Sequence, residues 1–239
     1  MRTDRIKKPE DLKGKKVGLP EYQLTANVWA RALLEDDHGV KPSDIHWVRG
    51  GIAEAGRPEK IAIKLPAGVK LEDAPAGKSI SALLGEGAID GFIAPRPPVL
   101  PKGTPHVGWL FAEPVAAATD YYRRTSIFPI MHLVGVRREL AEAHPWLPGA
   151  VLKAFEQSKQ AALAQLSDPS ASKVTLPFVE ERLAEARALM GEDFWSYGVE
   201  ANRKTLETFL RHHHAQGLSS RLVTVEEMFH PGTLETFKV

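Results

Sequence analysis

Residues 12–29 constrain the fold more than any other part of the chain. They read as a short buried strand over Lys16–Leu19 and a tight turn at Pro20, and a helix then opens near Gln23 and Thr25. A helix that directly follows a strand presents free backbone N–H groups, and the positive end of its dipole, to the crevice above the sheet. Such a crevice receives anions. The sequence therefore predicts a pocket for a small ligand that carries a carboxylate or phosphate.

The composition bounds the size of the fold and excludes several classes of partner. The chain has 239 residues, enough for one large domain or two small lobes with a hydrophobic core. Its 31 Lys and Arg residues nearly balance 30 Asp and Glu residues, so we expect no nucleic-acid partner. The absence of cysteine excludes disulfides and thiolate metal sites. The sequence shows neither a membrane-spanning apolar run nor the apolar core of a signal peptide, so we expect a cytoplasmic protein without a membrane partner.

Strand-like and helix-like segments alternate over the first half of the chain. Further strands are predicted at Ile45–Val48, Ile61–Leu65, Ile89–Ile93 and Met131–Val136, and Val107–Phe111 is another apolar segment. Helices are predicted at Leu24–Glu35, Ser81–Leu84, Leu147–Leu166, Val179–Leu189 and Arg203–His212. This alternation indicates an α/β fold with a parallel or mixed sheet. We place an α/β lobe at residues 10–125, and a returning strand with the helical part of the other lobe at residues 126–239.

Three arginines stand at or after predicted strands. Arg49 closes the second strand, Arg57 lies in the glycine-rich loop that follows, and Arg96 lies in a proline-rich loop after Ile89–Ile93. Guanidinium groups bind carboxylates in a bidentate manner, so such loops at one end of a sheet suit a dicarboxylate. A single surface arginine is more often simply solvated. Arg96 departs most from that interpretation, because the surrounding prolines restrict its loop.

Several other side chains could carry acid–base chemistry. His132 lies near Thr125 at the start of a predicted apolar strand, where ligand contacts concentrate, although a histidine in a strand is more often structural. Imidazole titrates near neutrality, which suits a proton donor to a ring carbon. Glu21 and Tyr22, at the mouth of the first helix, are further candidates whose alternative roles are capping and packing. For the run His212–His214 we expect a solvated helix end, because consecutive helical residues diverge too far to share a metal.

Five groups of residues together resemble the 4,5-dihydroxyphthalate decarboxylase family. They are Asp11–Gly18, Pro20–Gln23 with Thr25, Ala26 and Trp29, Gly50–Gly51 with Gly56–Arg57, Ile127–His132, and Gly191–Trp195 with Tyr197–Gly198. The similarity extends over essentially the whole chain. The resemblance implies a fold like that of type 2 periplasmic binding proteins, with two lobes of mixed sheets and flanking helices.

One departure from the family concerns the start of the chain. Family members carry a further stretch before the segment matched here, and that stretch forms half of the first lobe. We therefore expect the chain to lack the family's N-terminal stretch and its first lobe to be incomplete. The apolar stripe of Leu147–Leu166 is then expected to lack a sheet partner, which predicts self-association or poor solubility.

The resemblance also implies a reaction and roles for the candidate residues. The substrate class is a dihydroxylated aromatic dicarboxylate, decarboxylated by ring protonation and loss of CO2 without a cofactor or metal. His132 is expected as acid or hydroxyl partner, and Glu21 or Tyr22 as hydroxyl contacts. Substrate binding is expected from Thr25, Arg57, Arg96 and Thr125. Two alternative functions are a solute-binding protein for a small aromatic or thiamine-precursor-like ligand and an inactive lobe. We expect the chain to form a homo-oligomer and to bind a small aromatic acid as its substrate.

Overall fold

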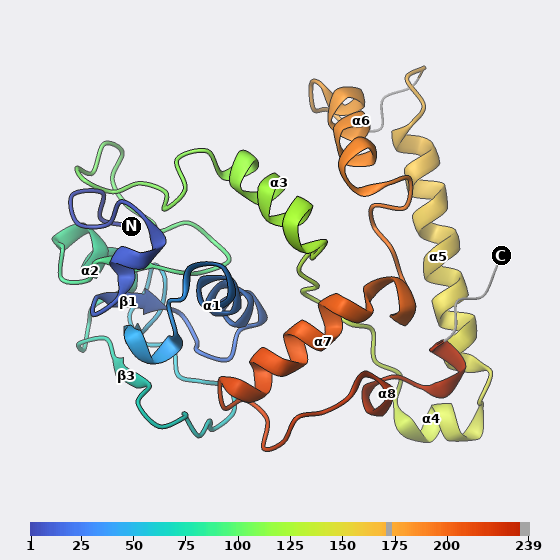
Figure 1. Cartoon of the computed structure of the whole chain (residues 1–239), viewed down its shortest axis with the longest axis horizontal. Coiled ribbons are helices and arrows are strands. Elements are labelled where there is room, and N and C mark those ends of the chain that lie inside the picture. The colour runs from blue at the N-terminus through green and yellow to red at the C-terminus, as the bar shows by residue number, and fades with distance from the viewer. Residues whose placement is uncertain (171–173, 235–239) are drawn as a thin grey trace. The chain divides into compact units, whose positions relative to one another are not determined.

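The computed structural model describes residues 1–170 and 174–234, and the chain forms two compact units (Figure 1). The first unit comprises Met1–Ala118 and Thr208–Leu222, and the second comprises Thr119–Glu207 and Val223–Val239. The lobes expected at residues 10–125 and 126–239 stay a prediction. Within the described residues, every helix is too short or too polar to serve as a membrane span.

The helices are distributed over the whole chain. They are α1 (Thr25–His38), α2 (Ile80–Glu86), α3 (Pro114–Thr125), α4 (Arg138–Ala143), α5 (Leu147–Leu166), α6 (Val179–Met190), α7 (Val199–Ala215) and α8 (Val225–Met228). Short 3-10 helices lie at Pro9–Leu12, Pro42–Asp44 and Pro231–Thr233. All five predicted helices are present, with ends that shift by a few residues, whereas α3, α4 and α8 were not predicted.

A four-stranded parallel sheet forms the centre of the first unit. Its strands are β1 (Lys16–Leu19), β2 (His46–Arg49), β3 (Lys70–Asp73) and β4 (Gly91–Phe92), in the order β3-β2-β1-β4. Val17 of β1 is in register with Trp47 of β2 on one side and with Gly91 of β4 on the other. The predicted strands at Lys16–Leu19, Ile45–Val48 and Ile89–Ile93 therefore share one sheet, which confirms the α/β fold.

Alternating residues of β1 and β2 face two different helices. Val17, Leu19 and Trp47 belong to a buried cluster that includes Leu34 of α1, whereas Val48 packs with residues of α2. Gly18 faces α2 so closely that an added Cβ would lie 2.4 Å from Cγ2 of Ile80. Strands β1 and β2 are thus buried on both faces, as expected for parallel strands joined by helices.

The strand predicted at Ile61–Leu65 is wrong. Residues 61–66 form no strand, and Ile61 is 70% exposed, while Ile63 and Leu65 pack against the core without pairing in the sheet. The position beside β2 is taken by Lys70–Asp73, a mostly exposed segment whose polar side chains hide its role. The apolar segment at Val107–Phe111 contributes only a single antiparallel bridge between Arg2 and Val107.

A buried network of polar side chains connects the C-terminal end of α7 to α1 within the first unit. Arg31 donates from Nε to Oε1 of Gln216 at 2.7 Å, and both side chains are 1% exposed. His212 is also 1% exposed, with Nε2 at 2.9 Å from Oδ2 of Asp36. The expectation of a solvated helix end is therefore wrong for His212, because its imidazole is docked on the carboxylate of α1; His214 is exposed as expected.

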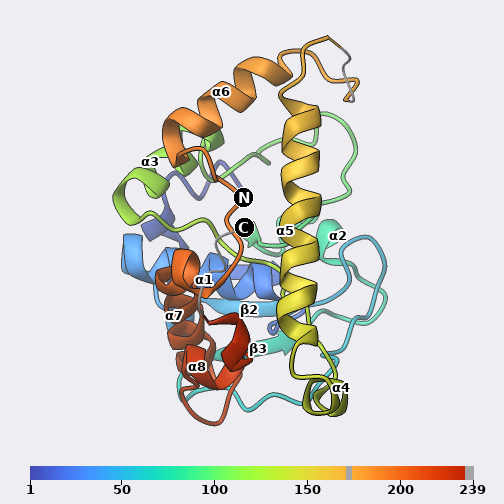
Figure 2. The same ribbon diagram turned by 90° about the vertical axis from the view of Figure 1, so that its right-hand side faces the viewer.

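The second unit is built mainly from helices around α5. Helix α4 lies at one end of α5 and α6 lies toward the other, as both views show (Figures 1 and 2). Lys159 of α5 is buried and forms ion pairs with Glu156 at 2.9 Å and with Asp193 at 2.7 Å. Its ammonium also lies 5.0 Å from the ring centre of Tyr197. The Gly191–Gly198 segment thus packs against α5 through polar as well as aromatic groups.

The strand predicted at Met131–Val136 is wrong. These residues form no regular element, and Met131, Leu133 and Val134 are 41%, 52% and 63% exposed. A strand exists only when its N–H and C=O groups pair with a neighbour, and the sheet of the described residues contains β1 to β4 alone. The apolar sequence of this segment favours a strand, but among the described residues no neighbouring strand pairs with it.

The apolar residues predicted to share one helix all lie on α5, but most of their side chains are exposed. Phe155 is 45% exposed, and Ala150, Ala154, Ala161 and Ala162 are also exposed. Only Pro148 and Lys159 of this helix are buried. The expectation that no sheet covers the stripe agrees with this exposure.

Candidate functional site

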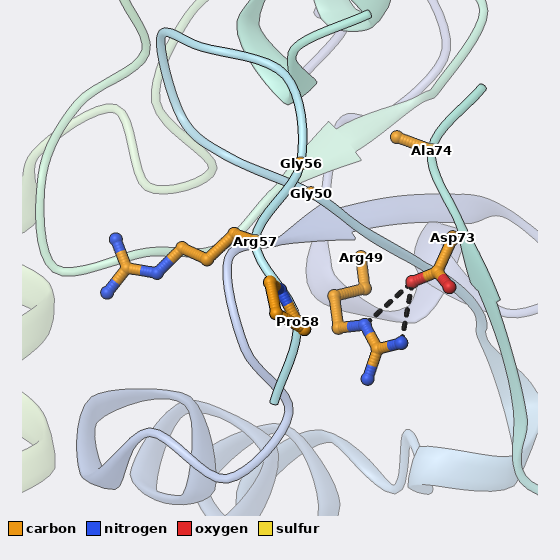
Figure 3. Close-up of a pocket in the computed structure, with 7 residues that line it drawn as sticks. All are labelled: Arg49, Gly50, Gly56, Arg57, Pro58, Asp73 and Ala74. Carbon is orange, nitrogen blue, oxygen red and sulfur yellow. Dashed lines mark hydrogen bonds and ion pairs between the residues drawn. The ribbon is translucent and has the colours of Figure 1, made fainter. Parts of the chain in front are cut away.

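A pocket of about 280 Å³ opens where β2 and β3 end (Figure 3). Its lining comes from the last residues of the two strands and from the loop after β2, and consists of Arg49, Gly50, Gly56, Arg57, Pro58, Asp73 and Ala74. The strands are parallel, so their carboxyl ends meet at one edge of the sheet. Ligands of open α/β sheets bind at this edge.

Arg49 is held at the pocket by a carboxylate from the neighbouring strand. Its Nε and Nη2 each lie 2.7 Å from Oδ1 of Asp73. The ion pair joins the last residue of β2 to the last residue of β3, which are partners in the sheet register. Figure 3 shows the Arg57 side chain extending away from this pair, so the two guanidinium groups serve different parts of the site.

Arg57 reaches Glu21, the second residue after β1. Its Nε donates to Oε1 of Glu21 at 2.7 Å. The Glu21 side chain is only 2% exposed, whereas the Arg57 side chain is 42% exposed. The second oxygen of Glu21, Oε2, is buried and has no hydrogen-bond partner among the described residues. A buried acceptor without a hydrogen-bond donor destabilises the folded protein. Oε2 of Glu21 is therefore suited to accept a hydrogen bond from an O–H or N–H group of a ligand.

The turn between β1 and α1 binds a carboxylate that the chain itself supplies. The N–H of Tyr22 donates to Oε1 of Glu59 at 2.6 Å, and the N–H of Gln23 donates to Oε2 at 3.3 Å. Nη1 of Arg49 lies 3.6 Å from Oε1 of Glu59, whose side chain is 5% exposed. The predicted anion-binding crevice after β1 thus contains an anion.

The side chain of Tyr22 belongs to the core rather than to the pocket. It is fully buried, packs edge-on against Trp47 and lies under the guanidinium of Arg31, with 3.7 Å from the Arg31 carbon to the ring centre. Burial raises the pKa of the Tyr22 phenol. Burial also lowers the pKa of Arg31 to about 10. What Tyr22 presents toward the site is its backbone N–H.

The remaining predicted site residues lie in different surroundings. Thr25 is half-buried at the first position of α1, and Arg96 is exposed on the loop after β4. Because β1, β2 and β4 are parallel, the segments carrying Glu21, Arg57 and Arg96 all leave the sheet at the same edge. The structure brings Glu21 and Arg57 into contact, and Arg96 is not part of the pocket lining.

Thr125 and His132 belong to the second unit. Thr125 ends α3, where its hydroxyl donates to the carbonyl of Tyr121 at 2.7 Å and accepts from the N–H of Ile127 at 3.1 Å. His132 is exposed in the irregular segment that follows. Nearby, the ring of Phe128 packs against Trp195, with 5.4 Å between the ring centres. Within the described part of the chain, no group of three His, Asp or Glu side chains is arranged to hold a metal ion.

Two residues of the site escaped the sequence analysis. Glu59 binds amides 36 and 37 positions earlier in the chain, so no local pattern marks it. Asp73 ends a strand whose polar sequence gave no strand signal. The one usable sign was the alternation of opposite charges after the glycines, in Arg57-Pro58-Glu59-Lys60.

Comparisons with known proteins agree with the resemblance seen in the sequence. A family model described as "NMT1/THI5 like" matches residues 1–58. A 4,5-dihydroxyphthalate decarboxylase from Comamonas testosteroni is 57% identical over 241 aligned residues, which cover 100% of this chain and 73% of the relative. A protein of the same description from Pseudomonas putida is 52% identical over 128 residues, covering 53% of this chain and 50% of that relative. The predicted family relationship is confirmed.

Proposed function

The chain belongs to the 4,5-dihydroxyphthalate decarboxylase family, and from this premise we propose that it removes one carboxylate from 4,5-dihydroxyphthalate to give protocatechuate. The observation that carries the proposal is the 57% identity to the Comamonas testosteroni enzyme over the whole chain. The pocket at the edge of the sheet is lined by Arg49 and Arg57, and guanidinium groups bind carboxylates in a bidentate manner.

The substrate itself provides the path for the electrons. Each of its carboxylates lies para to a phenolic hydroxyl, so the ring accepts a proton at the carboxylate-bearing carbon while the para oxygen stabilises the resulting positive charge. The bond to the carboxylate then breaks, its electron pair returns to the ring and CO2 leaves. One proton is consumed for each CO2 released. The protein must supply a proton donor, cationic groups for the carboxylates and a partner for the hydroxyl.

The residues of the first unit suit the binding roles. Arg57 is partly exposed at the pocket and anchored on Glu21, so its guanidinium is orientated before a carboxylate arrives. We assign carboxylate binding to Arg57 and Arg96. The unpaired Oε2 of Glu21 is assigned to the phenolic O–H, because it is a buried acceptor that lacks a donor among the described residues. Thr25 is assigned to a further contact with the ligand.

We assign the role of proton donor to His132. His132 is exposed, and it belongs to Ile127–His132, one of the segments that carry the family resemblance. Thr125 is assigned to a further contact with the ligand. Tyr22 is the weaker candidate, because its hydroxyl is buried in the core and burial raises its pKa.

The exposed apolar side chains of the second unit support a homo-oligomer. Phe155 is 45% exposed on α5, and Trp146 just before this helix is 67% exposed. Large apolar side chains of this kind often mark interfaces. We therefore propose that copies of the chain associate through the exposed face of α5.

The proposed reaction is tested by product analysis. The purified chain is incubated with 4,5-dihydroxyphthalate, and CO2 and protocatechuate are quantified together. Equal amounts of both products support the decarboxylase. Binding of the substrate without any turnover would instead support the solute-binding alternative, which the curated relatives do not favour.

A further inference from the structure

The carboxylate of Glu59 occupies a position built from main-chain donors. The N–H groups of Tyr22 and Gln23 bind its two oxygens, at 2.6 Å and 3.3 Å. These donors belong to the turn between β1 and α1, whereas Glu59 is carried by the loop between β2 and β3. With a side-chain exposure of 5%, the carboxylate is almost fully removed from water. Two amides and a nearby guanidinium are the usual partners of a bound carboxylate.

Every arginine that lines the pocket is already engaged by a carboxylate of the chain. Arg49 is bound by Asp73 and lies close to Glu59, and Arg57 is bound by Glu21. These five side chains carry two positive and three negative formal charges, so the cluster is negative by one. A dianionic ligand would be repelled by this arrangement. Release of one of these carboxylates from its donors would remove this repulsion.

Glu59 is the carboxylate whose place a ligand can take with the least change in bonding. Asp73 is fixed in a strand and Glu21 lies two residues after one, but Glu59 lies in a loop without regular structure. The loop is anchored near its start, where the N–H of Ile80 donates to the carbonyl of Gly51 and Ser81 donates to the carbonyl of Ile52. Beyond this anchor, residues 53–58 are exposed, so the stretch just before Glu59 packs against the core only lightly.

We propose that the N–H groups of Tyr22 and Gln23, together with Arg49, form the binding position for one carboxylate of an aryl dicarboxylate, and that Glu59 occupies this position in the ligand-free protein. The ligand exchanges one carboxylate for another on the same donors, and the Glu59 side chain turns out of this position. This inference rests on the proposed function for the class of ligand. The buried, unpaired Oε2 of Glu21, on the residue next to these amides, supplies an independent sign of an incomplete site.

Competition by Glu59 has a direct consequence for affinity. Substitution Glu59→Gln keeps an oxygen that accepts from the amides but removes the charge, so an incoming dianion displaces a weaker occupant. We expect the dissociation constant of phthalate, which lacks the hydroxyls needed for the reaction, to fall by about tenfold. Glu59→Asp keeps the charge but shortens the side chain, so it should give a smaller decrease.

Calorimetric titration with phthalate measures these constants without any turnover. Glu54→Gln is the matched control, because Glu54 is an exposed acid of the same loop, and its dissociation constant should equal that of the wild type. Thermal melting of each variant without ligand reports whether Glu59 also stabilises the fold. Tighter binding in Glu59→Gln than in Glu54→Gln supports the exchange, whatever the change in melting temperature.

The opposite results overturn the inference. Unchanged or weaker phthalate binding in both Glu59 variants, or no binding by any of them, would show that these amides are not a ligand position. The proposed function is tested separately, because it depends on turnover. A chain that fails to decarboxylate 4,5-dihydroxyphthalate but binds phthalate more tightly as Glu59→Gln would refute the enzyme and retain the binding position.

Discussion

Arg57 and Glu21 are joined by a hydrogen bond of 2.7 Å between a half-exposed guanidinium and a buried carboxylate. The pair links the loop after β2 to the turn after β1. Its geometry fixes the direction of Arg57 while leaving part of the guanidinium open to the pocket. A charged group that is orientated in advance binds an anion at a lower entropic cost than a free surface arginine.

Substitution Arg57→Ala should weaken substrate binding. A charge-assisted hydrogen bond to a carboxylate contributes roughly 1.5–3 kcal/mol, so KM for 4,5-dihydroxyphthalate should rise by about 10- to 100-fold. The matched control is Arg123→Ala, at an exposed arginine of α3. Steady-state kinetics of both variants make the comparison. Equal KM values for Arg57→Ala and the wild type would remove Arg57 from the binding site.

Substitution His132→Asn should affect turnover rather than binding. Asparagine keeps a hydrogen-bonding side chain of similar size but has no titratable proton, so decarboxylation should slow by about 10²- to 10⁴-fold. Substrate affinity, measured by titration in single-turnover conditions, should change little. His144→Asn provides the control, since this histidine is also exposed in the second unit. If His132→Asn turns over at the wild-type rate, the proton comes from another group.

The contact between Asp36 and the end of α7 predicts a pH dependence of stability. Burial raises the pKa of Asp36, but hydrogen bonds from Arg211 and His212 outweigh this effect, and the pKa is lowered overall. A lowered pKa in the folded state stabilises the protein above the unfolded pKa of about 4, and this contribution is lost as the pH falls through the folded value. Glu35, 3.8 Å from Nδ1 of His212, is the other acid facing this contact.

Substitution Asp36→Asn tests this contribution. Because the carboxylate is partly exposed, the loss should be only about 0.5–1.5 kcal/mol at pH 7. Urea unfolding of the variant and the wild type at pH 7 and pH 3 gives the two differences in the free energy of unfolding. The difference should be smaller at pH 3, which lies below the unfolded pKa of about 4, because the stabilising contribution is then partly lost. A difference of the same size at both values would mean that the charge of Asp36 has no role.

The exposed face of α5 predicts a self-associating protein. Substitution Phe155→Glu places a charge within the apolar stripe and should shift the chain toward the monomer. Sedimentation velocity over a range of concentrations measures the distribution. A wild-type chain that remains a monomer at all concentrations would contradict the proposed association.

The sequence predicted the buried half of the sheet well, because the residues of β1 and β2 are constrained locally. Val17, Leu19 and Trp47 are apolar and closely followed by turn residues, so their pattern alone marks strands. The edge strand β3 was missed because Lys70–Asp73 is polar and becomes a strand only through its pairing with β2. Conversely, the apolar residues of Met131–Val136 predicted a strand for which the described residues contain no neighbour.

In the site, too, residues positioned by their local sequence were predicted, whereas those positioned by contacts with distant segments were not. Arg57 was recognisable, because an arginine in a glycine-rich loop after a buried strand is placed by local sequence. Its partner Glu21 was recognised only as an acid near a helix, since the bond between the two residues depends on the loop path. Glu59 could not be identified, because its donors are main-chain N–H groups and these carry no sequence signature.

The central claim is that this chain decarboxylates 4,5-dihydroxyphthalate by protonating the ring, and a reaction carried out in D2O tests it most directly. Protocatechuate should form with one deuterium at the carbon that lost the carboxylate, as measured by proton NMR and mass spectrometry, and CO2 should appear in equal amount. Protocatechuate incubated with the protein in D2O controls for later exchange. Absence of protocatechuate, or a product without deuterium at that carbon, would contradict the proposed function.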